Sequence, residues 1–137
     1  MLIITKIIRR EVGDIARRHG LSLVLLFGSA AAGNARQDSD IDIAIKFRDG
    51  DVGLRRTLEI QREISALFGG KEVDLALLNR ADPLFMKKIA ERFISLHGEP
   101  GEIEAFLLLS FRRYQDHRKY LDMERDFAEG YVKRIAL

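Results

Sequence analysis

The sequence predicts an α+β fold: a mixed β-sheet with helices packed mainly on one face, followed by a long C-terminal helix. Residues 40–47 and 72–78 each alternate aliphatic residues with acidic or small ones, as expected for strands that bury one face. Segments with helical spacing of apolar residues separate the expected strands, and residues 102–131 form one long helical pattern. This order favours a sheet whose acid-bearing face is left open.

The N-terminal third is expected to contain one helix and one buried strand. Ile4, Ile8, Val12 and Ile15 recur at helical spacing, and Gly20 ends the pattern. Residues 22–27, SLVLLF, are a continuous apolar run, which is typical of a strand covered on both faces. We expect a short helical turn over residues 30–32, preceded by a serine in the N-cap position.

The rest of the chain continues the alternation of strands and helices. A helix is expected to begin near Leu54 and to end at Gly69, with Leu54, Leu58, Ile64 and Phe68 as its apolar residues. Residues 82–93 begin with Asp-Pro, a common helix start, and residues 94–98 form a short strand or loop.

The C-terminal helix is expected to use its large apolar residues mainly for packing, with a partner interface as the alternative. These residues are Ile103, Phe106, Phe111, Tyr114, Leu121 and Phe127.

Length and composition are those of a small globular domain. We interpret the 137 residues as one domain, with a core over residues 1–98 and a C-terminal helix over residues 101–137. The 23 basic and 21 acidic residues leave a net charge of +2, too even to suggest nucleic acid as a partner. The chain has no cysteine, which excludes disulfides and thiolate metal sites. No segment reaches the roughly 20 apolar residues of a membrane span, so we expect a cytoplasmic protein without a membrane partner.

Three aspartates are the first candidates for a functional site. Asp40 and Asp42 share one face of a strand, and Asp74 lies on a second strand with the same phase. Two carboxylates about 4 Å apart repel by roughly 4 kcal/mol at an effective dielectric constant near 20. Because a domain is stable by only about 5–15 kcal/mol, such a cluster is a poor structural device unless a cation joins it. Ligands that are all oxygen indicate Mg²⁺ or Mn²⁺.

Gly28 and Ser29 are candidates for binding phosphate. They stand between a buried strand and a helical turn, where free backbone N–H groups favour an anion. A phosphate site followed ten residues later by paired acids is typical of a nucleoside triphosphate site, in which metal ions bridge phosphate oxygens.

Gly28-Ser29, ten intervening residues and Asp40-Ile41-Asp42 together resemble the GS-x10-DxD signature of the DNA polymerase beta-like nucleotidyltransferase superfamily. Asp74, in EVDLAL, matches the third acid of these proteins. The chain is most similar to the minimal nucleotidyltransferases, or MNT proteins, over residues 22–98. Residues 28–37 depart from many relatives, which carry an arginine before the inner glycine; Arg36 is the candidate to replace its charge.

The resemblance implies a polymerase beta-like fold and a role for each matching residue. Asp40, Asp42 and Asp74 would be the catalytic and metal-binding residues, and Asp74 would also help to deprotonate an attacking hydroxyl. Gly28 and Ser29 would bind the β- and γ-phosphates of the nucleotide. The implied activity is magnesium-dependent transfer of AMP from ATP to a tyrosine of a partner HEPN toxin, with the chain acting as antitoxin.

Three other functions are weighed against protein adenylylation. The first is the same chemistry on a small molecule such as an aminoglycoside, although those enzymes carry a larger acceptor-binding domain. The second is a non-catalytic antitoxin that acts as a binding module. The third, addition of nucleotides to nucleic-acid ends, is disfavoured by the balanced charge. The sequence leaves the oligomeric state, including a homo-oligomer, open.

Three further residues have weaker claims to a functional role. Lys46 lies on the acid-bearing face as a counter-charge or a substrate contact. Arg112 and His117 have the R-x4-6-H spacing of HEPN ribonucleases. That motif belongs to a helical bundle, whereas only one helix is expected here, so we assign these two residues no catalytic role.

Overall fold

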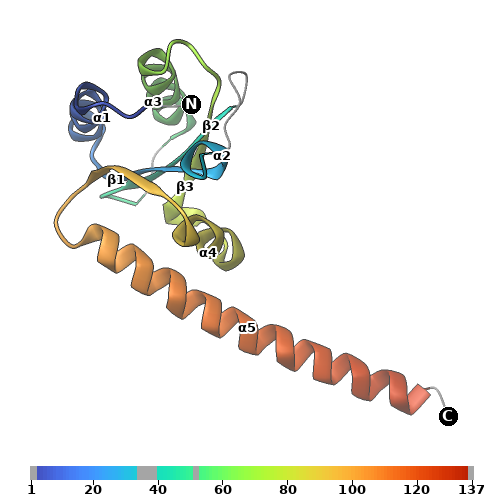
Figure 1. The fold of residues 1–137 in the computed structure, drawn as a ribbon. Coiled ribbons are helices and arrows are strands. Elements are labelled where there is room, and N and C mark those ends of the chain that lie inside the picture. Colours follow the sequence, from blue (N-terminus) through green and yellow to red (C-terminus); the bar gives the residue numbers. More distant parts are fainter. Residues whose placement is uncertain (1–2, 34–39, 51–52, 136–137) are drawn as a thin grey trace.

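The computed structural model describes residues 3–33, 40–50 and 53–135, and it confirms the α+β fold (Figure 1). A four-stranded mixed sheet is combined with helices on its two faces and with one long C-terminal helix. The elements are α1 (Lys6–His19), β1 (Leu21–Phe27), α2 (Gly28–Ala31), β2 (Ile41–Phe47), α3 (Leu54–Leu67), β3 (Val73–Leu77), the short 3-10 helix η1 (Leu78–Arg80), α4 (Pro83–Glu91), β4 (Ile94–Gly98) and α5 (Glu102–Ile135).

The sheet order β3-β2-β1-β4 brings three strand ends together at one edge of the molecule. Strand β1 pairs antiparallel with β2 and β4, while β2 and β3 run parallel. The end of β1 therefore lies beside the beginnings of β2 and β3. In this register Phe27 pairs with Asp42, and Asp42 pairs with Asp74.

Local capping contacts mark the ends of α1 and α4, and two of them, at Gly20 and Asp82, were predicted from the sequence. Thr5 Oγ1 accepts a hydrogen bond of 3.1 Å from the Ile8 amide at the start of α1, and Gly20 ends that helix with a φ of 68°. The Asp82 carboxylate accepts a hydrogen bond of 3.0 Å from the Phe85 amide at the start of α4. These local bonds satisfy backbone groups that would otherwise be unpaired.

Two apolar clusters cover the two faces of the sheet. The larger one joins α1 and α3 to the face that carries the isoleucines of β2. The smaller one joins Met86, Ile89 and Phe106, from α4 and α5, to β1 and to Ala44 of β2. The acid-bearing face is thus covered along part of its length, and the acids lie near the end of the sheet rather than on a fully open face. Figure 1 shows α1 and α3 on one side of the sheet and α4 and α5 on the other.

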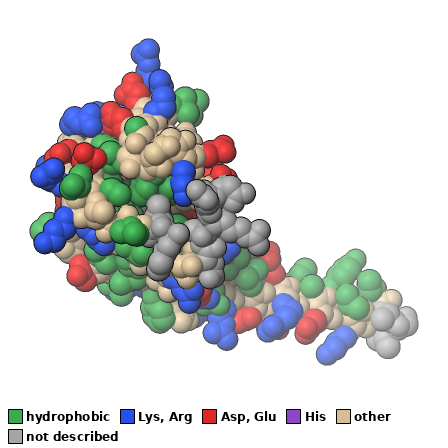
Figure 2. Space-filling view, turned by 45° about the horizontal axis from the view of Figure 1, so that its top comes forward, with side chains coloured by type: hydrophobic (Ala, Val, Ile, Leu, Met, Phe, Trp, Pro, Cys, Tyr) green, Lys and Arg blue, Asp and Glu red, His purple; other side chains and the backbone are tan. Residues whose placement is uncertain are grey.

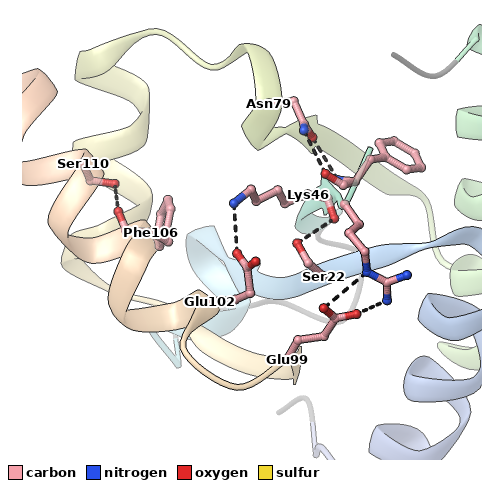
Figure 3. A network of polar contacts seen from close by, with 9 residues as sticks. Ser22, Lys46, Asn79, Glu99, Glu102, Phe106 and Ser110 are labelled. Carbon is pink, nitrogen blue, oxygen red and sulfur yellow. Dashed lines mark hydrogen bonds and ion pairs between the residues drawn. The ribbon is translucent and has the colours of Figure 1, made fainter. Parts of the chain in front are cut away.

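A network of polar contacts connects the start of α5 with the sheet (Figure 3). Lys46 Nζ lies 2.9 Å from a carboxylate oxygen of Glu102, and Arg48 pairs with Glu99 just before the helix. The Asn79 side chain accepts a hydrogen bond from the Phe47 amide at 2.9 Å and donates one to its carbonyl at 3.0 Å. Lys46 is therefore the counter-charge of Glu102.

Most of α5 extends away from the body of the molecule (Figure 1). Phe106 is buried, as the packing interpretation expected, but Phe111, Leu121 and Phe127 are exposed by 62%, 44% and 72%. For these three residues the expectation of packing within the chain is wrong. Leu54 and Leu58 of α3 are likewise exposed, although both belong to the apolar pattern that predicted this helix. No helix in the described part of the chain is long and apolar enough to cross a membrane.

Candidate functional site

The predicted aspartates lie at the end of the sheet where β1 stops and where β2 and β3 begin. Asp42 is the second residue of β2, and its register partner on the parallel strand β3 is Asp74. Residues paired in register on neighbouring strands present their side chains on the same face. Asp40 lies just before β2 and is exposed, as is Asp74, while Asp42 is half-buried. The predicted phase of the two strands is therefore observed.

The three carboxylates are close enough to influence one another. Burial raises the pKa of the Asp42 carboxyl above its ordinary value, and the negative charges of Asp74 and Asp40 raise it further. The positive charge of Lys88 acts in the opposite direction and lowers this pKa. Asp42 is therefore the acid that would gain most from a cation at this edge.

Gly28 allows the chain to turn directly against the Asp42 carboxylate. Its φ is +72°, a conformation that side chains disfavour, and a Cβ placed on it would lie 2.1 Å from Asp42 Oδ2. Only glycine fits this position without a shift of Asp42. This requirement links the predicted phosphate-binding residue to the predicted acid.

Ser29 lies inside α2 rather than at its N-cap. The helix begins at Gly28, two residues earlier than expected, and the cap position is taken by Phe27 in an extended conformation without a side-chain hydrogen bond. The expectation that Ser29 caps a turn over residues 30–32 is therefore wrong. With no capping role, the half-buried Ser29 side chain stands at the cavity described next.

A cavity of about 700 Å³ brings four of the predicted residues together. Gly28, Ser29, Asp42 and Asp74 line it, and Asp40 is not among its lining residues. The remaining lining residues come from the end of β1, from β3, from α4 and from the C-cap positions of α2 and α4: Phe27, Ala32, Leu75, Ala76, Phe85, Lys88, Glu91 and Arg92. The volume lies within the range of about 300–1,000 Å³ that is usual for small-molecule sites.

The α4 residues of the cavity were missed by sequence reasoning. Phe85 and Lys88 are three residues apart on α4, beside the buried positions Met86 and Ile89, and Arg92 follows as the C-cap residue of this helix. This spacing indicates a second helix face. The sequence alone did not show that this face would lie at the acid-bearing end of the sheet.

The donor set fits a hard divalent cation that shares its ligands with a nucleotide. Within the described residues no three aspartate, glutamate, histidine or cysteine side chains are grouped as ligands of one ion. Mg²⁺ is usually bound by one or two carboxylates together with substrate phosphates, rather than by a cage of protein ligands alone. Asp42 and Asp74 form such a pair of carboxylates on adjacent strands.

The other residues singled out from the sequence lie elsewhere. Arg112 and His117 are on the projecting helix α5, and neither lines the cavity. Arg36, the candidate for the missing arginine of the loop, falls outside the described residues.

Two named relatives match much of the chain. A protein of Methanocaldococcus jannaschii that carries the name of a protein adenylyltransferase is 30% identical over 65% of this chain and 94% of its own length. The protein adenylyltransferase MntA of Shewanella oneidensis is 32% identical over 69% of this chain and 67% of its own length.

The fold also matches a solved complex. In the structure of the tri-AMPylated HEPN toxin of S. oneidensis with its MNT antitoxin, the matching chain gives a TM-score of 0.66 at 22% identity. The match covers 95% of this chain and 99% of that one, so the likeness extends over the long C-terminal helix.

Residues 11–99 match the family described as polymerase beta nucleotidyltransferase, which spans β1 to β4 and every residue of the cavity. The chain therefore belongs to the polymerase beta nucleotidyltransferase family.

Proposed function

We propose that this chain is a magnesium-dependent protein adenylyltransferase that transfers AMP from ATP to a tyrosine hydroxyl of a partner HEPN toxin. The observation that carries the proposal is the register pair Asp42–Asp74 beside Gly28 in one cavity. Two carboxylates and a close backbone turn are what a metal-bound triphosphate needs. A cytoplasmic location and ATP as the donor are parts of the same proposal.

The proposed reaction is an in-line displacement at the α-phosphorus of ATP. The tyrosine oxygen forms a bond to that phosphorus, and the bond from phosphorus to the oxygen bridging the α- and β-phosphates breaks. The phenolic proton passes to the carboxylate of Asp74, and pyrophosphate leaves with the bridging oxygen. Gly28 and Ser29 hold the β- and γ-phosphates through the backbone N–H groups and the serine hydroxyl.

Asp40, Asp42 and Asp74 have the role of holding the metal, and Asp74 also helps to deprotonate the attacking hydroxyl. When bound, magnesium would neutralise carboxylate and phosphate charge and favour ionisation of the attacking hydroxyl. Asp40 does not line the cavity, but its charge acts on Asp42, so we place it at the outer edge of the same site.

A protein acceptor is supported by the relatives and by the surface of α5. MntA of S. oneidensis is named a protein adenylyltransferase, and the solved complex from that organism holds an AMPylated toxin. In this chain the exposed part of α5 carries hydrophobic side chains among charged ones (Figure 2). They include Phe127, Tyr131 and Val132, which are 72%, 52% and 57% exposed. Contiguous exposed apolar residues of this kind mark surfaces that bind other proteins.

The experiment is to incubate the chain with a HEPN partner, ATP and Mg²⁺, and to weigh both proteins intact by mass spectrometry. We expect the partner to gain the mass of one or more AMP groups. Asp42→Asn should abolish the gain. The matched control is Asp49→Asn, because Asp49 is an exposed acid in the turn at the opposite end of β2.

The same experiment tests the alternatives. The exposed surface of α5 favours one of them in particular, an antitoxin that acts by binding alone. A tight complex without any mass gain would support that function and contradict transfer. AMP appearing on an aminoglycoside, with an unmodified partner, would support the small-molecule alternative. A mass gain that survives Asp42→Asn would contradict the assignment of the site.

A further inference from the structure

The wall of the cavity formed by α4 and its C-cap residue Arg92 carries three charged residues, and only one of them has a counter-ion among the described residues. Glu91 lies 2.6 Å from Lys87 Nζ, one helical turn earlier. The Lys87 ammonium also lies 4.6 Å from the centroid of the Tyr114 ring of α5, so it contacts both α4 and α5. Glu91 therefore already has a positive partner, whereas Lys88 and Arg92 make no side-chain hydrogen bond or ion pair with any described residue.

Lys88 is also the cation whose charge reaches the acids. It lines the same cavity as Asp42 and Asp74. Its charge stabilises the ionised form of Asp42 and lowers the pKa of that carboxyl, although the two side chains form no ion pair. Lys88 thus lines the same cavity as the carboxylates and remains available to a ligand.

We propose that Lys88 binds the β- and γ-phosphates of the nucleotide and, after transfer, the pyrophosphate product. A ligand that contacts both Asp42 and Lys88 must offer positive charge to the one and negative charge to the other. A metal-bound polyphosphate does both, whereas a simple carboxylate would be repelled by the two aspartates. The lysine ammonium is a compact charge with three donors, which suits non-bridging phosphate oxygens. This inference rests on the proposed nucleotidyl transfer.

The geometry gives Lys88 a distinct place beside the predicted phosphate-binding residues. Gly28 and Ser29 lie on α2 after β1, and Lys88 lies on α4 after β3. The phosphates would then be held from two elements that are far apart in sequence and are brought together at this edge of the sheet. Charge on the departing pyrophosphate increases as the bond to the α-phosphorus breaks, so Lys88 would assist departure as well as binding.

The test measures binding directly, by calorimetry with Mg²⁺ and three probes. The probes are a non-hydrolysable α,β-methylene analogue of ATP, pyrophosphate, and AMP. We expect Lys88→Gln to weaken the affinity for the ATP analogue and for pyrophosphate by roughly 10-fold or more. The affinity for AMP should stay within about 2-fold of that of the unchanged chain. Lys88→Arg should restore most of the affinity. Lys6→Gln on α1, at the opposite face of the sheet, is the matched control and should bind like the unchanged chain.

Pyrophosphate binding that is equal in the unchanged chain and in Lys88→Gln would overturn the inference. An equal loss for AMP and for the ATP analogue would also overturn it, because that result indicates a collapsed cavity rather than a lost phosphate contact; melting curves check the fold. If triphosphate binding depends on Lys88 but no partner is ever labelled, the inference stands and the protein acceptor is rejected. If the unchanged chain binds none of the probes, both the inference and the proposed function fail.

Discussion

Gly28 and Asp42 depend on each other at the level of single residues. The glycine needs its positive φ for the turn after β1, and the missing Cβ leaves the space that the Asp42 carboxylate occupies. Substitution by alanine would create two separate problems, an unfavourable backbone conformation and a clash with the carboxylate. The backbone effect can be measured apart from the clash, because an alanine at Gly20 would have the unfavourable φ but no atom within 4 Å of its Cβ.

Gly28→Ala is expected to reduce AMP transfer by at least about 100-fold, since the added methyl group displaces the Asp42 carboxylate from the site. Gly20→Ala is the matched control. Its φ is +68°, nearly the same as that of Gly28, but nothing lies within 4 Å of an added Cβ. Both variants should lose about 1 kcal/mol or more of stability from the backbone alone. Steady-state transfer rates and melting temperatures measure the two effects. Equal activity in both variants would contradict the role given to the close approach.

Asp42→Asn is expected to stabilise the chain when magnesium is removed by a chelator. Burial and the charges of Asp74 and Asp40 raise the Asp42 pKa in the folded state, so the folded state binds more protons than the unfolded state just above pH 3.8. Stability therefore falls as the pH rises through this window, and the penalty persists at neutral pH. Neutral asparagine removes the penalty, and we expect a rise in melting temperature of roughly 1–4 °C at pH 7.

The difference in melting temperature between the unchanged chain and Asp42→Asn should disappear below pH 3.8, where the Asp42 carboxyl is protonated in the folded and in the unfolded state. Melting curves over a pH series with a chelator measure it. A lower melting temperature for Asp42→Asn at pH 7 would show that Asp42 stabilises the fold, and would contradict the electrostatic account.

The acids could be predicted from the sequence, whereas their cationic neighbour could not. Asp40, Asp42 and Asp74 were predicted because a strand repeats every two residues, so phase along the strand determines the face. The placement of Asp74 opposite Asp42 needed in addition that β2 and β3 be neighbours, a condition that alternation along each strand left open and that the sheet order meets. Lys88 depends on how α4 crosses the sheet end, and helical periodicity contains no information on that position.

At the scale of elements, α5 consists of two parts with different surroundings. Its first turns pack on the sheet through Phe106, which is 3% exposed, while Phe127 further along is 72% exposed. The apolar spacing of residues 102–131 predicted the helix correctly, since periodicity depends on the chain alone. It could not show what covers the apolar residues, because a face that packs within the chain and a face that binds another protein have the same pattern.

The two parts of α5 should respond differently to the same substitution. Phe106→Ala is expected to lower the free energy of unfolding by about 3–5 kcal/mol, because it leaves a cavity in the smaller apolar cluster, where the Phe106 ring packs edge-on against Phe93. Phe127→Ala should change stability by less than about 0.5 kcal/mol. It should instead weaken binding to the HEPN partner. Denaturant unfolding and a binding titration separate the two effects; a large loss of stability in Phe127→Ala would mean that this residue packs within the chain.

At the scale of the whole molecule, all cavity residues belong to the part of the chain that contains the sheet, and the end of α5 projects away from that part (Figure 1). Every hydrogen bond and ion pair described for side chains after Lys119 joins residues of α5 itself, such as Arg125 with Asp122. The family match ends at residue 99, before α5 begins. The projecting turns therefore contribute no residue to the cavity. A helix without tertiary packing is only marginally stable in water, which favours a partner on these turns.

A chain shortened to residues 1–119 should accordingly keep the cavity and lose the partner. It retains Phe106 and Ser110, the buried residues of α5, together with the contact of Lys87 with Tyr114. We expect its melting temperature to change by only a few degrees, roughly what 1 kcal/mol produces in a domain of this size. Its affinity for a magnesium-bound ATP analogue should stay within about 2-fold, while AMP transfer to the HEPN partner falls below detection because docking is lost. Calorimetry and intact-mass measurements on the same preparation report both quantities. Transfer at the full rate by the shortened chain would show that the partner docks on the body, and the exposed apolar residues of α5 would then need a different occupant.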